Sequence, residues 1–593
     1  MPEPNLPRTH PVIFLVLREM RTPMLVLILV YAVAILGMAL MPAKDGGHMS
    51  LFHAFYFVMY TATTTGFGEV PQEFSNAQRL WASGCLFVTV VAWLYAIGSI
   101  IRLLQNVYFQ RVLVENRFVS AVRRLPGDFF ILCGFGDTGS LLARGLSNVG
   151  FSAVVLDKDE IRIKALGLRD YSVPMPGLCC DATLPQHLLE AGLQSPRCQG
   201  VVALTRDEEA NLKIAAVARL LNPKIRIIVK SGSQVHEETL ATLGARTYFV
   251  DPFKTFAEEL GAAICNPYLY LLNGWLAGAK NFRLDAEVTP LPRGHWIVCG
   301  FGRMGREVYK VLTEFGLSVA VISEGEIEEP VDVFIRGSAT AKTLKAAGIE
   351  RAVGIVAATD DDGRNLSILI NARAQNPKVF TIVRQNQHQN ELAFNAAHAD
   401  MIMQPSLITA RRIFFMLTTP LLRRLFIHLL EIHASRPEVI ADWIKRLRRA
   451  VGARPPRLLT LKVLENQAPA LWAALEAGAA VALGDLLRDP RDRRVWLPTV
   501  PLLVRSDDGV TYLPDKSYRL RRNDRIVLCG TEAAHRLLEA TVHNEYTLYY
   551  LVTGQDLPRA YWMRWLRKWQ GQTWNAVWPQ AVPNRAEGHT GPG

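Results

Sequence analysis

Cysteine is scarce in this chain and never falls at a spacing typical of a metal site. The eight cysteines stand at positions 85, 133, 179, 180, 198, 265, 299 and 529 of 593 residues. The adjacent pair at 179 and 180 does not readily form a bridge, and free thiols are typical of a reduced cytosolic compartment. The histidines likewise form no cluster at the spacing of zinc ligands. The pattern therefore identifies no zinc site and leaves other metals open.

Charge is missing from two long apolar stretches. The segments 24–41 and 80–101 contain no charged side chain. A helix rises ~1.5 Å per residue and needs about 20 residues to cross the hydrocarbon core, so both stretches are predicted to span a membrane. The Pro-rich start and the lack of a small-residue cleavage site argue against a signal peptide.

Positive charge is distributed unevenly around these spans. Three arginines precede the first span and five follow the second, whereas the connection has one lysine and one arginine: Arg8, Arg18 and Arg21, then Arg102, Arg111, Arg117, Arg123 and Arg124, against Lys44 and Arg79. Both termini are therefore predicted to be cytoplasmic and residues 42–79 external. The net charge of +12 would also suit nucleic acid, but no aromatic-interleaved basic fold motif is present, so no nucleic-acid partner is expected.

A short apolar segment and a glycine-rich stretch lie between the spans. Residues 51–61 are apolar and aromatic but too short to cross, and they lead into TTGFG at 64–68. Irregular backbone is tolerated at membrane depth only where it lines a wet cavity or is buried in protein. Glycine permits positive φ, which lets successive carbonyls face one axis and replace the water shell of a monovalent cation. The pattern predicts a re-entrant helix followed by an ion-lining segment.

This arrangement resembles the potassium channel family, whose selectivity filter reads T-V-G-Y-G-D. The matching positions are Thr64, Thr65, Gly66, Phe67, Gly68 and Glu69. The resemblance implies K⁺ as the permeant ion, a homotetramer and a bacterial inner-membrane location. Gly98 in the second span is a candidate gate at which the helix bends, although close packing between helices explains a glycine there equally well.

The remainder of the chain contains one unit twice. A strand, a glycine-rich turn, a helix and a second strand are predicted around CGFGDTG and around CGFGRMG. Three glycines recur with the same spacing in both copies: Gly134, Gly136 and Gly139, then Gly300, Gly302 and Gly305. Their spacing suits a tight turn, approach of a pyrophosphate to amides at a helix N-terminus, and close packing of helix on strand. The motif alone is weak, but its repeated strand-turn-helix context predicts a Rossmann-like fold.

The repeat continues past the turns and resembles the RCK domain, the regulator of potassium conductance with a TrkA-N-like lobe. CDATLPQHLLEAGL parallels GSATAKTLKAAGI, and prolines 252 and 267 parallel prolines 405 and 420. The resemblance implies crossing helices that pair two domains and one small C-terminal lobe. The expected fold class is an α-helical membrane pore, with two transmembrane helices plus a re-entrant pore helix, joined to two α/β Rossmann-like RCK domains and a small α+β C-terminal lobe.

The expected boundaries follow prokaryotic two-span potassium channels with two RCK domains on one chain. They are a cytoplasmic N-terminus (1–23), a pore domain (24–104), a linker that first continues the second helix (105–127), two RCK domains (128–280 and 281–450), a C-terminal lobe (451–545) and a Trp-rich basic tail (546–593). The tail, with Trp562, Trp565 and Trp569, suits a membrane interface or packing on a neighbouring domain.

Acidic residues specify the first nucleotide site. Asp157 is predicted to end the second strand, where a carboxylate accepts hydrogen bonds from ribose hydroxyls, so NAD(H), ADP, ATP or AMP is the expected ligand. Asp181 resembles the acid of the RCK family's G-D-A motif, with Cys180 at its glycine. Besides the glycines, the expected contacts are Phe135, Asp137, Thr138, Lys158, Ala182 and Thr205.

The second copy differs at the same positions. Ser323 and Ser338 stand where the first copy has its acids, and Arg306 is a second arginine at the phosphate turn. These changes predict weaker ribose recognition and stronger attraction of phosphate, so this site takes a different nucleotide or stays empty. The expected contacts, besides the glycines, are Arg303, Met304 and Glu324.

The predicted function is a potassium channel gated by nucleotide, not an enzyme. Acidic runs at 206–209 and 360–362 are interpreted as helix caps in preference to a divalent-cation site, and His236 and Glu237 as surface residues. Three alternatives stay open: a weakly selective cation channel, because Thr65 and Phe67 depart from the filter pattern; a non-conducting subunit of a potassium transporter; and a membrane-anchored NAD-dependent oxidoreductase.

Overall fold

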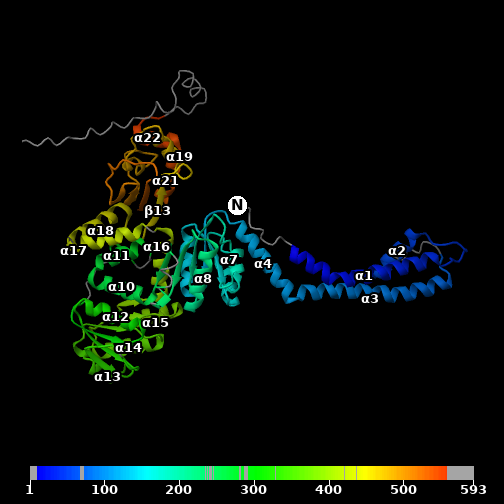
Figure 1. The fold of residues 1–593 in the computed structure, drawn as a ribbon, viewed down its shortest axis with the longest axis horizontal. Coiled ribbons are helices and arrows are strands. Elements are labelled where there is room, and N and C mark those ends of the chain that lie inside the picture. The colour runs from blue at the N-terminus through cyan, green and yellow to red at the C-terminus, as the bar shows by residue number, and fades with distance from the viewer. Residues whose placement is uncertain are drawn as a thin grey trace, which may run out of the picture.

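The structure is a computed structural model that divides into a helical hairpin, two α/β lobes and a C-terminal lobe (Figure 1). It describes residues 10–66, 73–233, 235–236, 238, 244, 246–278, 282–285, 292–327, 329–419, 421–435 and 437–556.

Two long helices form the hairpin: α1 (His10–Leu40) and α3 (Asn76–Gln105), with the shorter α2 (Leu51–Ala62) between them. Figure 1 shows α1 and α3 side by side at one end of the molecule. The segments Val16–Leu40 and Asn76–Gln105 are long and apolar enough to cross a membrane.

A glycine sets the distance between these helices. The indole of Trp81 covers Gly37, and its Nε1 donates to the carbonyl oxygen of Ala34 at 3.2 Å. Since a Cβ at position 37 would overlap the indole ring, only glycine permits this approach.

The second span ends abruptly, and the expected continuation of its helix is interrupted. Asn106 has an extended backbone, and α4 (Val107–Arg123) begins directly after it. The Asn106 side chain accepts from the amides of Tyr108 at 2.9 Å and Phe109 at 3.3 Å, which is an N-cap. The axis of α4 therefore departs from that of α3, as Figure 1 shows.

The first α/β lobe is a parallel sheet with strand order β3-β2-β1-β4-β5-β6. From β1 the chain adds β2 and β3 on one side of the sheet, and then β4, β5 and β6 on the other side. The point between β1 and β4 is a topological switch point, where ligands bind in such sheets. Its elements are β1 (Phe129–Cys133), α5 (Asp137–Asn148), β2 (Ser152–Asp157), α6 (Glu160–Gly167), β3 (Gly177–Cys179), α7 (Pro185–Glu190), β4 (Cys198–Ala203), α8 (Glu208–Leu221), β5 (Arg226–Lys230) and β6 (Thr247–Val250).

The second lobe repeats this topology with the order β12-β11-β10-β7-β8-β9. Its elements are β7 (His295–Cys299), α12 (Arg303–Glu314), β8 (Ser318–Ser323), β9 (Val333–Arg336), α13 (Ala341–Ala346), η1 (Ile349–Arg351), β10 (Gly354–Ala357), α14 (Asp362–Gln375), β11 (Phe380–Arg384), η2 (His388–Asn390), α15 (Glu391–Ala396) and β12 (Met401–Met403).

Each lobe packs on a helix that follows the other lobe in sequence. α10 (Pro252–Cys265), which follows the first sheet, buries Phe256 and Leu260 in the core of the second lobe. α16 (Pro405–Thr418), which follows the second sheet, buries Ile413 in the core of the first lobe. The helices α11 (Pro267–Leu276) and α17 (Leu422–Ser435) continue from them.

An ion pair joins the two exchanged helices. Glu259 of α10 and Arg411 of α16 form a direct salt bridge, and each side chain is 10% exposed. Burial raises the pKa of the Glu259 carboxyl, and the positive charges of Arg411 and Arg412 oppose that rise. The parallel pair Glu258–Arg412 is about 40% exposed on both sides.

The C-terminal lobe is an antiparallel sheet with order β13-β16-β14-β15. Its elements are α18 (Pro437–Val451), β13 (Arg457–Lys462), α19 (Pro469–Glu476), α20 (Leu483–Leu486), β14 (Thr499–Ser506), β15 (Gly509–Tyr512), β16 (Arg525–Gly530), α21 (Glu532–His543) and α22 (Glu545–Thr553). α22 buries Leu548 in the lobe core, so residues 545–553 belong to the lobe and not to the tail; residues 557–593 lie outside the described part. The architecture confirms the expected fold class.

Removal of one partner of the buried pair should destabilise the two α/β lobes. Arg411→Leu leaves the Glu259 carboxylate buried and unpaired, which costs about 3–5 kcal/mol. Because burial keeps the pKa of Glu259 raised, this loss should be largest at high pH and shrink as the pH falls and the carboxyl becomes protonated. Thermal unfolding of the full chain in detergent across pH measures both effects.

The neighbouring exposed pair supplies the matched control. Arg412→Leu should cost about 0–1 kcal/mol. The double variant Glu259→Leu/Arg411→Met should recover most of the loss, since apolar residues of similar volume replace the pair. Equal losses for Arg411→Leu and Arg412→Leu would contradict a special role for the buried pair.

Candidate functional site

Both glycine-rich turns depend on their first and third glycines. The φ angles of Gly134 and Gly300 are +108° and +93°, values that favour glycine. An added Cβ at Gly134 would lie 2.8 Å from the backbone of Leu204. At Gly139 and Gly305 an added Cβ would overlap the carbonyl oxygen of the first glycine in the same turn. These glycines therefore fix the turn and the close packing of helix on strand.

The middle glycines face open space instead. An added Cβ at Gly302 meets nothing within 4 Å, and one at Gly136 meets only Nη1 of Arg162 at 3.7 Å. α5 and α12 begin directly after these two glycines, and neither helix receives a side-chain cap. Uncapped amides at a helix N-terminus beside open space form an arrangement that binds phosphate.

Asp157 connects the first turn to the end of β2. Its Oδ2 accepts from the amide of Phe135 at 2.5 Å and its Oδ1 from the amide of Asp159 at 2.8 Å, and only 8% of the residue is exposed. Arg162 of α6 lies 3.5 Å from the same carboxylate. Arg162 belongs to no motif, so sequence reasoning missed it; only the fold of α6 places it over the turn.

Lys158 and Asp181 lie beside Asp157. Lys158 Nζ is 3.1 Å from Asp181 Oδ2, and Asp181 Oδ1 accepts from the amide and hydroxyl of Thr183 at 2.9 and 2.8 Å. Burial alone would raise the pKa of Asp181, but the hydrogen bonds from Thr183 and Lys158 outweigh it and lower that pKa. The carboxylate therefore stays ionised at the ends of β2 and β3, with the buried Ala182 next to it.

In the second lobe a cavity of about 990 Å³ opens over the glycine-rich turn. This volume lies at the upper end of the range for ligand pockets, about 300–1,000 Å³. Glu324 Oε1 accepts from the Ser338 hydroxyl at 2.5 Å, and Arg364 Nη1 lies 3.6 Å from its other oxygen. Five of the six predicted contacts of this lobe line the cavity: Gly300, Gly302, Arg303, Met304 and Glu324. The sixth, Gly305, does not; it packs against Gly300 behind the turn.

Arg303 links this cavity to the first lobe. Its Nη1 donates to Glu208 Oε1 at 3.0 Å, and its guanidinium lies 4.4 Å from the ring centre of Phe253. Glu208 Oε2 accepts from the Ser231 hydroxyl at 2.7 Å and the Gly232 amide at 3.1 Å. Burial opposes ionisation of Glu208, but these hydrogen bonds and Arg303 lower its pKa overall. Arg303 therefore lies at the glycine-rich turn of the second lobe and also pairs with an ionised carboxylate of the first lobe.

Two neighbouring predictions change. Arg306 does not line the cavity; its Nε lies 3.9 Å from Glu329 and its guanidinium 5.9 Å from the ring centre of Phe301. His236, predicted as a surface residue, is half-buried: its side chain is 20% exposed and its Nδ1 lies 3.8 Å from Glu208. Glu237 lies outside the described residues.

A buried asparagine closes the wall of each site, and sequence reasoning missed both. Asn211 accepts from the Thr205 amide and hydroxyl at 2.9 and 2.7 Å and donates to the Lys230 carbonyl at 2.9 Å. Asn365 makes the same bonds in the second lobe. Alignment of TRDEEAN with TDDDGRN would have found them. The Thr205 hydroxyl is thus already engaged within the wall.

One acid of each acidic run caps a helix, as predicted. Asp207 accepts from the amides of Glu209 and Ala210 at 3.0 and 3.2 Å, and Asp361 accepts from the amide of Arg364 at 2.7 Å. Within the described residues no group of three or more His, Cys, Asp or Glu side chains is arranged to hold a metal.

The segment after α2 leaves helical geometry at once. Thr64 has φ of +58° and Gly66 of +61°, whereas Thr65 between them is not in the left-handed region. The amides of Thr65 and Gly66 donate to the Tyr60 carbonyl at 3.0 and 3.4 Å. This alternation keeps successive carbonyls from taking opposite sides as they do in a strand. Residues 67–69 lie outside the described part.

Gly98 lies within the unbroken helix α3. An added Cβ there would meet no atom within 4 Å, so packing inside one chain does not explain the glycine. Its role as a gate stays a prediction.

Family models match the helical hairpin and both α/β lobes. The Ion channel family model matches residues 24–106, and the TrkA-N domain model matches residues 130–251 and 296–405. An uncharacterized protein of Methanothermus fervidus is 33% identical over 175 residues, 28% of this chain and 27% of that protein. Potassium channel protein 1 of Methanocaldococcus jannaschii is 26% identical over 220 residues, 36% of this chain and 63% of that protein. The chain thus covers less than two thirds of each relative.

Among solved structures, "GsuK channel bound to NAD" is 16% identical with a TM-score of 0.47, and the match covers 90% of this chain and 99% of that chain.

The glycines of one turn should separate folding from ligand binding. Gly302→Ala adds a Cβ in open space at an ordinary φ of −73°, so stability should change by about 0.5 kcal/mol or less. That Cβ occupies the expected phosphate position, so stabilisation by added ADP or NAD⁺ should fall. Gly305→Ala forces an overlap with Gly300 and should cost about 1–3 kcal/mol. Thermal unfolding with and without ligand measures both; equal destabilisation by the two variants would contradict these roles.

Proposed function

We propose that this chain, which joins an ion-channel segment to two TrkA-N domains, forms a potassium channel gated by nucleotide binding. The observation that carries the proposal is the half-length helix α2 followed by left-handed Thr64 and Gly66, placed between two apolar spans. A soluble nucleotide-binding enzyme has no use for such a segment.

The pore is formed by several copies of the chain. Residues Thr64 to Gly68 supply carbonyls and a hydroxyl that replace the hydration shell of K⁺. Thr64, Thr65 and Gly66 are exposed in a single chain, and one such loop cannot enclose an axis, so we infer a homotetramer. The flanking arginines orient both termini toward the cytoplasm of a bacterial inner membrane. The name of the Methanocaldococcus relative supports K⁺ as the ion.

The two lobes bind different ligands in this proposal. In the first, the uncapped amides of α5 take the phosphates of NAD(H) or an adenine nucleotide such as ADP or ATP, and Asp157 takes the ribose. In the second, Arg303 adds positive charge at the turn and Glu324 replaces the first-copy acid, so a nucleotide held mainly through its phosphates suits the cavity.

Binding reaches the pore through α4. Phe118 and Val122 of α4 belong to the same buried core as Leu178 and Cys180. Cys180 directly precedes Asp181, so a ligand that contacts Asp181 lies next to the core that anchors α4. α4 follows the second span α3 directly after Asn106. A ligand that binds one arrangement of α4 more tightly than another therefore biases the gate. Gly98 is the candidate hinge.

The alternatives differ in measurable ways. A weakly selective cation channel conducts Na⁺ and K⁺ alike, a transporter subunit binds nucleotide without conducting, and an oxidoreductase consumes NADH with a substrate. Since no acid–base pair beside a substrate domain accompanies Asp157 in the described part of the chain, the enzyme hypothesis has no site for its chemistry there.

Current through the purified chain tests the proposal. In a planar bilayer under a K⁺/Na⁺ gradient, the reversal potential should lie near that of K⁺, and cytoplasmic NAD⁺, NADH or ADP should change the open probability. Asp157→Asn should weaken the response about tenfold, the loss of one hydrogen bond to a charged group.

Asp170→Asn, an exposed site in the same lobe, is the matched control and should respond as the unaltered chain does. No current from a folded, tetrameric preparation would overturn the channel, and a response unchanged in Asp157→Asn would overturn the assigned ribose contact.

Substitutions of Arg303 and of its partner Glu208 should have opposite effects on ADP binding. Arg303→Gln should weaken ADP binding at the second cavity, whereas Glu208→Gln should strengthen it because the carboxylate no longer competes for Arg303. Each change should be about threefold to tenfold, as for one charged contact. Titration calorimetry in an Asp157→Asn background, where the first site should bind about tenfold more weakly, separates the second site from the first. Arg306→Gln, outside the cavity lining, serves as control; weakening by both Glu208→Gln and Arg303→Gln would contradict the competition.

A further inference from the structure

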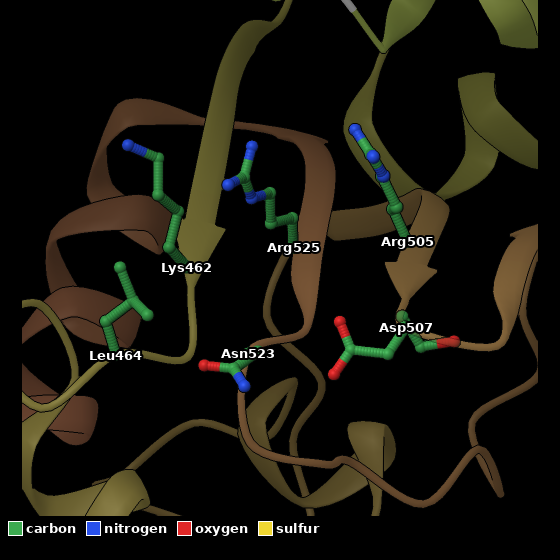
Figure 2. Close-up of a pocket in the computed structure, with 7 residues that line it drawn as sticks. Lys462, Leu464, Arg505, Asp507, Asn523 and Arg525 are labelled. Atoms are coloured by element: carbon green, nitrogen blue, oxygen red, sulfur yellow. The ribbon is translucent and has the colours of Figure 1, made fainter.

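Three basic residues stand side by side on neighbouring strands of the C-terminal lobe. Arg525 of β16 is directly opposite Lys462 of β13 on one side and Arg505 of β14 on the other. Residues directly opposite in an antiparallel pair have Cβ atoms about 4.5–5.5 Å apart. Figure 2 shows the three side chains rising from these strands with their charged ends on the same side. We call Lys462, Arg525 and Arg505 the basic row.

The alternation of the strands places the basic row on one face of the sheet. The adjacent residues Leu461, Ile526 and Val504 belong to the core that α19, α21 and α22 cover. Side chains of successive strand residues point to opposite faces. The basic row therefore lies on the other face of the sheet, at the strand ends.

The basic row has no counter-charge within the described residues. Three other arginines of the lobe form ion pairs with carboxylates: Arg457 with Glu532 at 3.1 Å, Arg521 with Asp508, and Arg522 with Glu476 at 3.9 Å. No carboxylate in the described part of the chain lies within 4.0 Å of the charged ends of Lys462, Arg505 or Arg525. Like charges directly opposite in a sheet are destabilising, so the fold gains nothing from this arrangement.

The basic row borders a cavity of about 260 Å³. Its other lining residues are Leu464, Ser506, Asp507 and Asn523, and Figure 2 places Asp507 and Asn523 at the border away from the charged ends. With three cations and one carboxylate, the formal charge of the lining is +2. The cavity is thus concave, polar and positively charged.

We propose that the basic row binds a small anion with one or two phosphate groups. Guanidinium groups match phosphate oxygens in a bidentate geometry, and a lysine adds a point charge. The cavity is smaller than the roughly 300–1,000 Å³ typical of sites for whole organic ligands, and its lining has no aromatic side chain on which a base stacks. Phosphate, pyrophosphate or the terminal phosphates of a larger molecule fit this description.

Lipid phosphate does not fit the position of the site. Figure 1 places the C-terminal lobe at the end of the molecule away from α1 and α3. The anion is therefore one dissolved in the cytoplasm, either free or as part of a nucleotide whose base stays outside the cavity.

Hydrogen exchange of the full chain in detergent tests the site, since it reports each segment separately from the glycine-rich turns. Pyrophosphate should protect residues 460–464, 505–509 and 523–526. In Arg505→Gln/Arg525→Gln the pyrophosphate concentration needed for protection should rise about tenfold or more, the loss of at least one charged contact. ADP that protects these segments at a lower concentration than pyrophosphate identifies a nucleotide; pyrophosphate alone identifies a free anion.

Two further variants make the outcome decisive. Arg521→Gln should leave protection unchanged, because Arg521 is paired with Asp508 and does not line the cavity. Arg525→Glu should abolish protection and raise the melting temperature, because a carboxylate between two cations replaces repulsion with attraction. The proposal is overturned if neither probe protects these segments, if the double glutamine variant is protected equally, or if Arg525→Glu lowers the melting temperature.

Discussion

The exchange of α10 and α16 between the two α/β lobes is the constraint on which the part of the structure outside the helical hairpin depends. Each helix completes the core of a lobe to which its own sequence does not belong, and the buried pair of Glu259 and Arg411 joins the helices where they meet. Removal of α10 would expose apolar surface on the second lobe, and removal of α16 would expose it on the first. The two lobes therefore form one mechanical unit, although each has a complete parallel sheet.

This unit brings the second cavity into contact with the first lobe. α10 begins with Pro252 and Phe253, and Phe253 stacks on Arg303 while Glu208 holds the same guanidinium. Glu208 opens α8, which follows the fourth strand of the first sheet. A ligand that draws Arg303 toward its phosphates removes a charge partner from the first lobe. At the far edge of that sheet β3 shares a core with α4, which follows the second span α3 in the chain, so both sites are physically connected to that span.

The features that depend on neighbouring residues in the sequence could be predicted from it. The spans follow from uncharged length, and the roles of Gly134 and Gly139 follow from spacing, because a turn and a close helix contact impose glycine wherever they occur. The crossing of the helices was predicted only through the resemblance to the RCK domain, since the repeat aligns each helix with its own copy and tertiary packing alone decides its partner. Arg162 was missed for the same reason, and the break at Asn106 depends on one side-chain cap in an otherwise helical stretch.

Arg303 and the basic row would respond differently to a bound anion. The guanidinium of Arg303 already has a carboxylate and an aromatic ring as partners, so a phosphate there exchanges one favourable contact for another and the net free energy stays small. Such a balance suits a reversible regulatory site. The cations of the basic row repel one another and have no carboxylate partner within the described residues. A bound anion would therefore stabilise the row without breaking an ion pair. The same chemistry thus favours coupling between lobes at the turn and stiffening of one sheet in the C-terminal lobe.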